Sequence, residues 1–135
     1  MRTRRTQAGI ALVMLVMTMA MAACGPKKAE LSSTMTDFKY DPATWQVPAG
    51  GQVTLTLTNA GSVKHEWVLM KKGYSVTTPF SDAKDGSSAL EDYDVEPGQT
   101  QVFNFTAPTE AGDYEVVCGV AGHLENGMKG TLTVQ

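Results

Sequence analysis

Tyr114-Glu-Val-Val-Cys118-Gly-Val-Ala-Gly-His123-Leu-Glu-Asn-Gly-Met128-Lys-Gly130 is the stretch of this sequence that decides the fold. It places a thiol, an imidazole and a thioether five residues apart in a glycine-rich loop, after one run that reads as a strand and before another. Sulfur and nitrogen donors grouped in this way are typical of metal sites. The stretch therefore predicts a metal-binding loop between two strands.

The types of donor atom favour copper. A deprotonated cysteine, neutral histidine nitrogens and a weak thioether suit an ion that must be held both as Cu(I) and as Cu(II). A zinc site more often has paired cysteines and histidines at short spacings, and no methionine. The chain of 135 residues has only two histidines, His65 and His123, and a blue-copper centre needs two. We therefore expect both of them to be ligands, with Cys118 and Met128.

The alternation of side chains predicts where the more distant histidine lies. In residues 63–70 a period of two places His65 on the same face as Trp67, so His65 begins a strand on its core side. By the same count, Cys118 ends a strand on its core side. If the two strands are antiparallel neighbours, the start of one lies beside the end of the other. Both side chains then meet at one rim of a sheet.

These residues resemble a known family. Cys118, His123 and Met128, with His65 before an apolar strand, are similar to the copper site of cupredoxins, most of all those of the auracyanin and rusticyanin type. The resemblance implies one copper ion, with the Cys118 sulfur and one nitrogen of each histidine as equatorial ligands and Met128 as a weak axial ligand. It further implies a one-electron carrier between extracytoplasmic redox partners, such as cytochromes or membrane oxidoreductases, of a respiratory or photosynthetic chain.

Three residues near the ligands depart from the family pattern. Relatives usually have Asn after the first histidine and often Ser or Thr after the cysteine, and a hydrogen bond between them ties the two ligand loops. Here the residues are Glu66 and Gly119, so that bond lacks both partners. We expect Glu66 either to face solvent or to bond backbone amides. Ala121 stands where many relatives have Pro, which implies a looser loop or one extra amide donor.

The resemblance also implies which backbone groups contact the copper and its cysteine ligand. The amides of Glu66 and Val120 are expected to donate hydrogen bonds to the Cys118 sulfur, and the Lys64 carbonyl to approach the copper opposite Met128.

His123 lies among small apolar residues, and in the family such a rim is the port through which electrons pass to a partner. We expect this port to comprise His123 with Val120, Ala121 and Leu124; the alternative is that these are ordinary loop residues.

The rest of the chain predicts an all-β fold. Residues 52–59 alternate apolar residues with threonines, as a strand with one packed face does. Residues 35–40 are expected to form one half-buried strand. About seven or eight short strands without a long helical pattern predict an antiparallel Greek-key β-sandwich over 34–135. Within 71–96 we expect a flap with a short helix near 87–92, whose acidic side chains either dock a partner or stay solvated.

The first residues read as an export signal. Three arginines precede an apolar run over 8–20, and small residues precede Cys24. We expect a lipoprotein-type signal peptide over 1–23, lipidation of Cys24 and a flexible tether over 24–33. The alternative is an ordinary signal peptide that leaves Cys24 as a free thiol.

The net charge of the chain without its signal peptide limits the kinds of molecule that it is expected to bind. Eight lysines and 14 acidic residues give a net charge of −6. Because no basic patch is present, nucleic acid is not an expected partner. We expect a monomer outside the cytoplasm, anchored to a bacterial membrane by its lipid.

Catalysis is not expected from these residues. The sequence shows no nucleophile with an adjacent base, and four protein ligands leave a metal no open position for a substrate. The alternative function is a copper-binding module that delivers or stores copper. A third reading, a metal-free adhesion or scaffolding domain, conflicts with the complete set of ligands.

Overall fold

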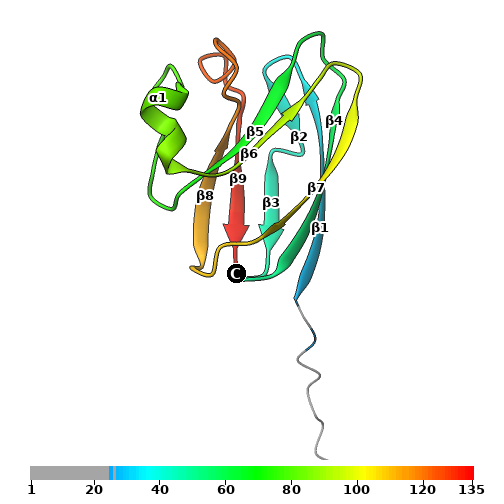
Figure 1. Ribbon diagram of the computed structural model, residues 1–135, viewed down its shortest axis with the longest axis vertical. Coiled ribbons are helices and arrows are strands. Elements are labelled where there is room, and N and C mark those ends of the chain that lie inside the picture. The colour runs from blue at the N-terminus through cyan, green and yellow to red at the C-terminus, as the bar shows by residue number, and fades with distance from the viewer. Residues whose placement is uncertain (1–24, 26) are drawn as a thin grey trace, which may run out of the picture.

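The computed structural model describes residues 25 and 27–135 and arranges them as two facing β-sheets (Figure 1). The predicted signal peptide and Cys24 lie outside these residues. The described part contains a short helix, α1 (Asp82–Asp85), a 3-10 turn (Gly86–Ser88) and nine strands. The strands are β1 (Lys28–Thr36), β2 (Lys39–Asp41), β3 (Thr44–Val47), β4 (Gln52–Asn59), β5 (His65–Met70), β6 (Ala89–Val95), β7 (Thr100–Thr106), β8 (Gly112–Val117) and β9 (Lys129–Val134).

The strand order is β2-β1-β4-β7 in one sheet and β3-β9-β8-β5-β6 in the other. The predicted all-β sandwich is confirmed, with nine strands rather than about seven or eight in the described residues. The expectation of purely antiparallel pairing is wrong, because β1 runs parallel to β4 and β3 runs parallel to β9. The chain crosses to the second sheet at β3 before it returns as β4, so β4 enters the first sheet in the direction of β1.

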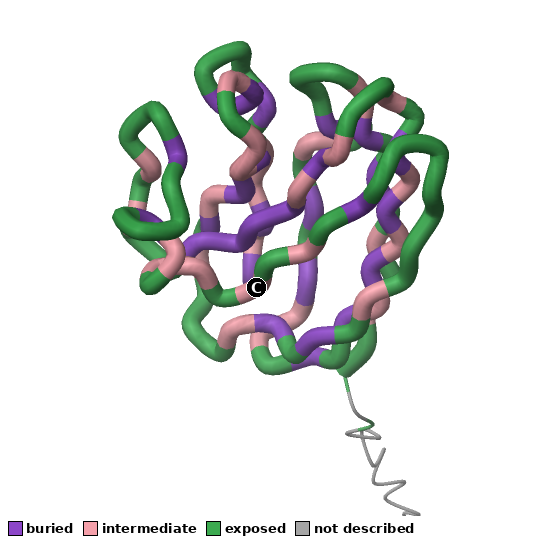
Figure 2. The backbone as a smooth tube through the Cα atoms, turned by 45° about the horizontal axis from the view of Figure 1, so that its top comes forward, coloured by how far each residue is buried: buried purple, intermediate pink, exposed green. Residues whose placement is uncertain are grey.

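Aromatic side chains fill the core between the sheets. Trp67 on β5 is fully buried, with its ring centroid 5.7 Å from that of Trp45 and 5.9 Å from that of Phe105. The inward residues of β4 are buried as predicted. Figure 2 shows these buried strand segments inside a shell of exposed loops. A closely packed interior resists displacement, so the ends of the core strands have fixed positions.

The predicted tether is wrong from Lys28 onward, because residues 28–33 belong to β1. They pair with β4 from Lys28 opposite Gln52 to Ser33 opposite Leu57. The Ser33 hydroxyl also donates a hydrogen bond of 2.9 Å to the carbonyl of Pro42. A polar segment becomes a strand here because a neighbouring strand satisfies its backbone groups. The domain therefore starts several residues before the predicted boundary at 34.

Residues 35–40 are not one strand: they comprise the end of β1, a turn and the start of β2. Met35 and Tyr40 pair across β1 and β2, and both are buried in the core. The chain reverses at Asp37 and Phe38, where Phe38 has a φ of 65°. This turn lies at the same end of the sandwich as the loop between β8 and β9, opposite the C-terminus (Figure 1).

The segment 71–96 also differs from its prediction. Its helix is α1, at Asp82–Asp85 rather than near 87–92, and Ala89–Val95 forms strand β6, antiparallel to β5. The acidic residues Asp92 and Asp94 are exposed on β6. Because exposed acidic residues are also typical of loops, this strand was predicted as part of a flap. The segment covers the outer face of β5, where Phe80 packs with Val68, Met70, Val117 and Leu124. No helix in the described part of the chain has the length and apolar character needed to span a membrane.

Candidate metal centre

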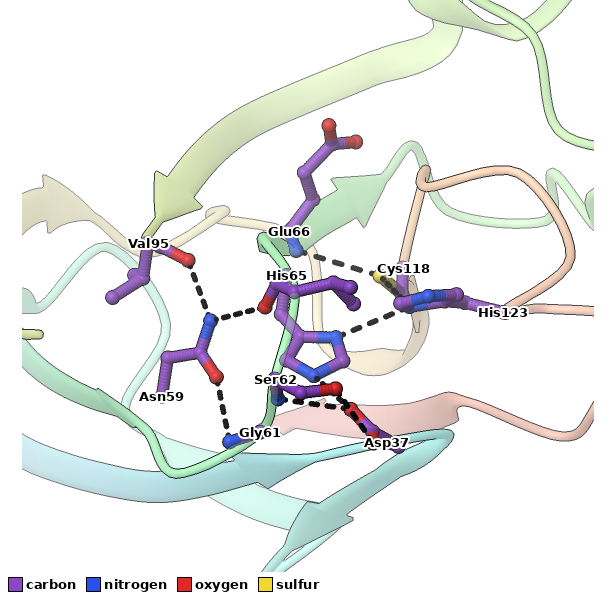
Figure 3. Close-up of polar contacts among 10 residues, drawn as sticks. Asp37, Asn59, Gly61, Ser62, His65, Glu66, Val95, Cys118 and His123 are labelled. Atoms are coloured by element: carbon purple, nitrogen blue, oxygen red, sulfur yellow. Dashed lines mark hydrogen bonds and ion pairs between the residues drawn. The ribbon is translucent and has the colours of Figure 1, made fainter. Parts of the chain in front are cut away.

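Three side chains with donor atoms meet at one end of the sandwich. His65 is the first residue of β5, and Cys118 follows the last residue of β8. These strands are antiparallel neighbours, with Val68 opposite Val117, so the start of β5 lies beside the end of β8. The loop between β8 and β9 then brings His123 over both (Figure 3). The predicted meeting of the two strand ends is confirmed.

The donor atoms of these residues converge within the range of a single metal ion. The Nδ1 atoms of His65 and His123 are 3.1 Å apart, and the Cys118 Sγ is 3.4 Å from the His123 Nδ1. All three donor atoms lie within 4.8 Å of one another. His65 and Cys118 are fully buried and His123 is 6% exposed. Two imidazole nitrogens and one thiol sulfur thus face a common point inside the protein.

Met128 is held next to these ligands by the backbone. Its amide donates a hydrogen bond of 3.0 Å to the His123 carbonyl, and its carbonyl accepts one of 3.1 Å from the Cys118 amide. The Met128 side chain is fully buried in the core cluster that contains Cys118. Gly122 and Gly127 have positive φ, which suits the tight turns of this loop. The loop therefore has a defined shape that carries all three of its predicted ligands.

Burial sets the protonation of the site when no cation is bound. Burial raises the pKa of the Cys118 thiol, while hydrogen bonds from the amides of Glu66, at 3.4 Å, and Val120 oppose this. Burial, followed by the nearby His123, lowers the pKa of His65. Burial thus favours the neutral imidazole of His65 and opposes a negative charge on the Cys118 sulfur more than the two amides offset. A bound cation stabilises that negative charge, so the donor set fits a copper ion.

The neighbours of Cys118 show what replaces the family's hydrogen bond between the ligand loops. Glu66 neither faces solvent freely nor is seen to bond backbone amides through its side chain; its carboxylate pairs with Lys64 Nζ at 2.7 Å. It also lies against Gly119, where an added Cβ would overlap Oε2 of Glu66 and the ring of Phe80. Lys64 pairs with Asp94 as well, at 3.1 Å, and these two acids raise its pKa. The side chain of Lys64 therefore links Glu66, next to the cysteine, to Asp94 on β6.

The predicted electron port is only partly exposed. Ala121 is exposed and Val120 is half-buried, beside a nearly buried His123. Leu124 is 7% exposed and packs with Phe80 and Val117, so it does not contribute to an exposed rim.

Two further residues reach the site from the turn between β1 and β2, and neither was predicted from the sequence. The Phe38 ring, 44% exposed, meets the His123 ring edge to face with centroids 5.3 Å apart. Asp37 Oδ1 lies 3.5 Å from His65 Nε2 (Figure 3). No signal in the sequence placed this turn next to the histidines, because neither residue is a glycine or proline that would mark a reversal.

Comparison with known proteins agrees with this geometry. The family model of the cupredoxin-like domain matches residues 9–134. The chain belongs to the cupredoxin-like family. Among solved structures, auracyanin A, a "blue" copper protein from Chloroflexus aurantiacus, is 26% identical with a TM-score of 0.68, and the match covers 80% of this cupredoxin and 99% of auracyanin A. The resemblance to the auracyanin type is thereby confirmed.

Curated relatives also match more than half of this cupredoxin. One is the copper-resistant cuproprotein CopI of Rubrivivax gelatinosus, 30% identical over 112 residues, which are 78% of this chain and 63% of CopI. Another is sulfocyanin of Sulfolobus acidocaldarius, 33% identical over 96 residues, which are 64% of this chain and 47% of sulfocyanin. The matches thus span about half to two thirds of the length of these relatives.

Proposed function

We propose that this cupredoxin holds one copper ion between His65, Cys118, His123 and Met128 and carries single electrons between redox partners. The observation that supports this most is the convergence of one nitrogen of each histidine and the Cys118 sulfur inside the protein, within 4.8 Å of one another. Copper in such a site supplies a Cu(II)/Cu(I) couple. The protein carries out no bond chemistry of its own, since four ligands leave no position for a substrate.

The protein's part in this function is to keep the ligands in place while the charge of the site changes. His65 and Cys118 lie at the ends of packed core strands, and backbone hydrogen bonds fix the turn between His123 and Met128. Because these positions are set by the fold, little rearrangement accompanies the gain or loss of an electron. The amide of Glu66 near the sulfur stabilises its negative charge and so favours Cu(I).

Electrons would pass through the histidine nearest to the surface. His123 is almost covered, and the half-exposed Phe38 ring and Ala121 lie beside it. A small apolar surface of this kind suits brief contacts with redox proteins such as cytochromes or membrane oxidoreductases. We include Phe38 in this contact surface in place of Leu124.

The location that we propose is outside the cytoplasm. An export signal over 1–23 and a lipid on Cys24 would anchor the domain to a bacterial membrane. Mass spectrometry of the mature N-terminus is the measurement that checks this. A mature chain that begins at another residue, or an unmodified Cys24, would contradict the lipid anchor without affecting the copper site.

The visible absorption spectrum of the Cu(II)-loaded protein tests the electron-carrier function. We expect a strong band near roughly 600 nm from charge transfer between the cysteine and copper. The band should be absent in Cys118→Ser and present in a Ser33→Ala control, whose hydroxyl bonds Pro42 away from the site. A pale protein with only weak copper bands would reject an electron carrier of this type.

Copper delivery or storage is the second candidate function, and the name of one relative, the copper-resistant cuproprotein CopI, favours it. The two functions differ in how readily copper leaves. A carrier keeps its buried ion, whereas a delivery or storage protein exchanges it. Loss of Cu(I) to a chelator within minutes, on mixing with the reduced protein, would support delivery, and retention for hours would support electron transfer.

A further inference from the structure

Asp37 lies on the far side of His65 from the proposed metal position. The His65 Nδ1 faces His123 at 3.1 Å, and its Nε2 faces Asp37 Oδ1 at 3.5 Å. The Nε2 atom is buried and has no hydrogen-bond partner in the described structure, so the 3.5 Å approach of Asp37 is an ion-pair distance and not a formed hydrogen bond. If copper occupies Nδ1, the proton of the neutral ring is on Nε2, where Asp37 is the acceptor that meets it.

The approach of Asp37 depends on the absence of a side chain at Gly61. A Cβ on Gly61 would lie 2.5 Å from His65 Nε2 and 2.7 Å from Asp37 Oδ1, too close to both atoms for the two groups to keep these positions. The turn that contains Gly61 is itself fixed, because the buried Asn59 side chain accepts a hydrogen bond from the Gly61 amide and donates one to the carbonyl of Val95 (Figure 3).

Ser62 also holds the Asp37 carboxylate. The amide and the hydroxyl of Ser62 contact its two oxygens at 3.3 and 3.2 Å. Two separate turns, between β1 and β2 and between β4 and β5, thus bring one acidic side chain to the imidazole.

We propose that Asp37 is a positioning residue for the copper ligand His65, which accepts the Nε2 proton and thereby fixes the ring and its tautomer. This inference rests on the proposed copper site. A carboxylate acceptor makes the imidazole a stronger electron donor, and its charge favours Cu(II) over Cu(I). Asp37 therefore lowers the reduction potential of the site. Its side chain is 49% exposed, so solvent screens part of the effect of its charge, and a charge control is needed.

The test compares Asp37→Asn and Asp37→Ala with Asp41→Asn. Asp41 lies in strand β2, next to the same turn, with its side chain 72% exposed, so its substitution removes the same charge without contacting His65. We expect Asp37→Ala to weaken Cu(II) binding about tenfold relative to Cu(I), as the loss of such a contact to a metal-bound histidine typically does, which raises the potential by about 59 mV. Asp37→Asn should give a smaller rise and Asp41→Asn almost none. Equal potentials in Asp37→Ala and Asp41→Asn would overturn the proposal.

A readout without copper separates this inference from the proposed function. The ring-nitrogen NMR shifts of metal-free protein report which nitrogen of His65 carries the proton. We expect Nε2 in the parent protein and in Asp41→Asn, and a mixture of tautomers in Asp37→Ala. An unchanged tautomer in Asp37→Ala rejects the role of Asp37, whatever the colour of the copper protein. A colourless copper protein together with the expected tautomers rejects the copper function and retains the contact.

Discussion

Gly119 leaves the space that the Glu66 carboxylate occupies beside the cysteine ligand. The residue pair that ties the ligand loops in relatives is missing here, and an ion pair of Glu66 with Lys64 lies in this region instead. The two departures from the family pattern thus form one arrangement, because a larger side chain after Cys118 would collide with Glu66 and Phe80.

We predict that Gly119→Ala destabilises the protein by about 1–3 kcal/mol, the usual cost of forcing an extra methyl group into a packed site. The measurement is the midpoint of urea unfolding of the metal-free protein. Gly86→Ala is the matched control, since its added Cβ would meet its nearest neighbour at 3.7 Å, an ordinary contact. Adding Glu66→Ala should recover part of the loss. If the two glycine variants have equal stability, the packing at Gly119 is not as tight as described.

Met128 is a residue whose role in the potential can be separated from its role in packing. We predict that Met128→Leu keeps the blue colour and raises the reduction potential, because a weak sulfur donor is lost that stabilises Cu(II) more than Cu(I). Leucine has a similar volume, so the loss of stability should stay below about 1.5 kcal/mol.

Met70→Leu provides the control for this change, because Met70 is also fully buried but packs in the second cluster, with Val68 and Phe80. Its potential should equal that of the parent protein. Equal potentials in all three proteins would remove Met128 from the ligand set.

At the scale of elements, the sequence revealed the strands whose side chains alternate and missed those defined by distant partners. The positions of His65 and Cys118 were predicted because period two places each at the end of a core strand. Residues 28–33 of β1 were missed because the pairing of this segment with β4 leaves little apolar signal in the segment itself. The turn at Asp37 and Phe38 was missed because its reversal depends on a positive φ at a phenylalanine. Contacts that this turn makes with the histidines were therefore not predictable.

The assignment of residues 28–33 to β1 leads to a prediction about truncation. A protein that begins at Thr34 lacks the parallel pairs from Lys28 to Ser33 and leaves that edge of β4 without its partner strand. At about 0.5–1.5 kcal/mol for each hydrogen bond lost, we expect its free energy of unfolding to fall by about 3 kcal/mol or more. A protein that begins at Lys27, whose carbonyl still accepts from Gln52, should keep the parent's stability. Equal urea midpoints for the two truncations would restore the tether interpretation.

At the scale of the whole molecule, the sandwich brings donor atoms from two strands and one loop close together. Core packing positions the two imidazoles, and burial raises the pKa of the Cys118 thiol. Metal binding removes the proton from the sulfur and is coupled to folding, because the folded chain brings the donor atoms together. The free energy of copper binding should consequently appear as added stability of the folded chain.

We predict that copper raises the melting temperature and that the rise depends on Cys118. At a free copper concentration of 100 times the dissociation constant, the gain is about 2.7 kcal/mol, which corresponds to about 10 °C or more in a domain of this size. Differential scanning calorimetry with and without copper measures it, and Cys118→Ser should lose most of the rise.

The acidic residues Glu66, Asp92 and Asp94 form a second group that can approach one ion. A rise that persists in Cys118→Ser but disappears in Asp92→Asn would place the stabilising copper there and not between the histidines.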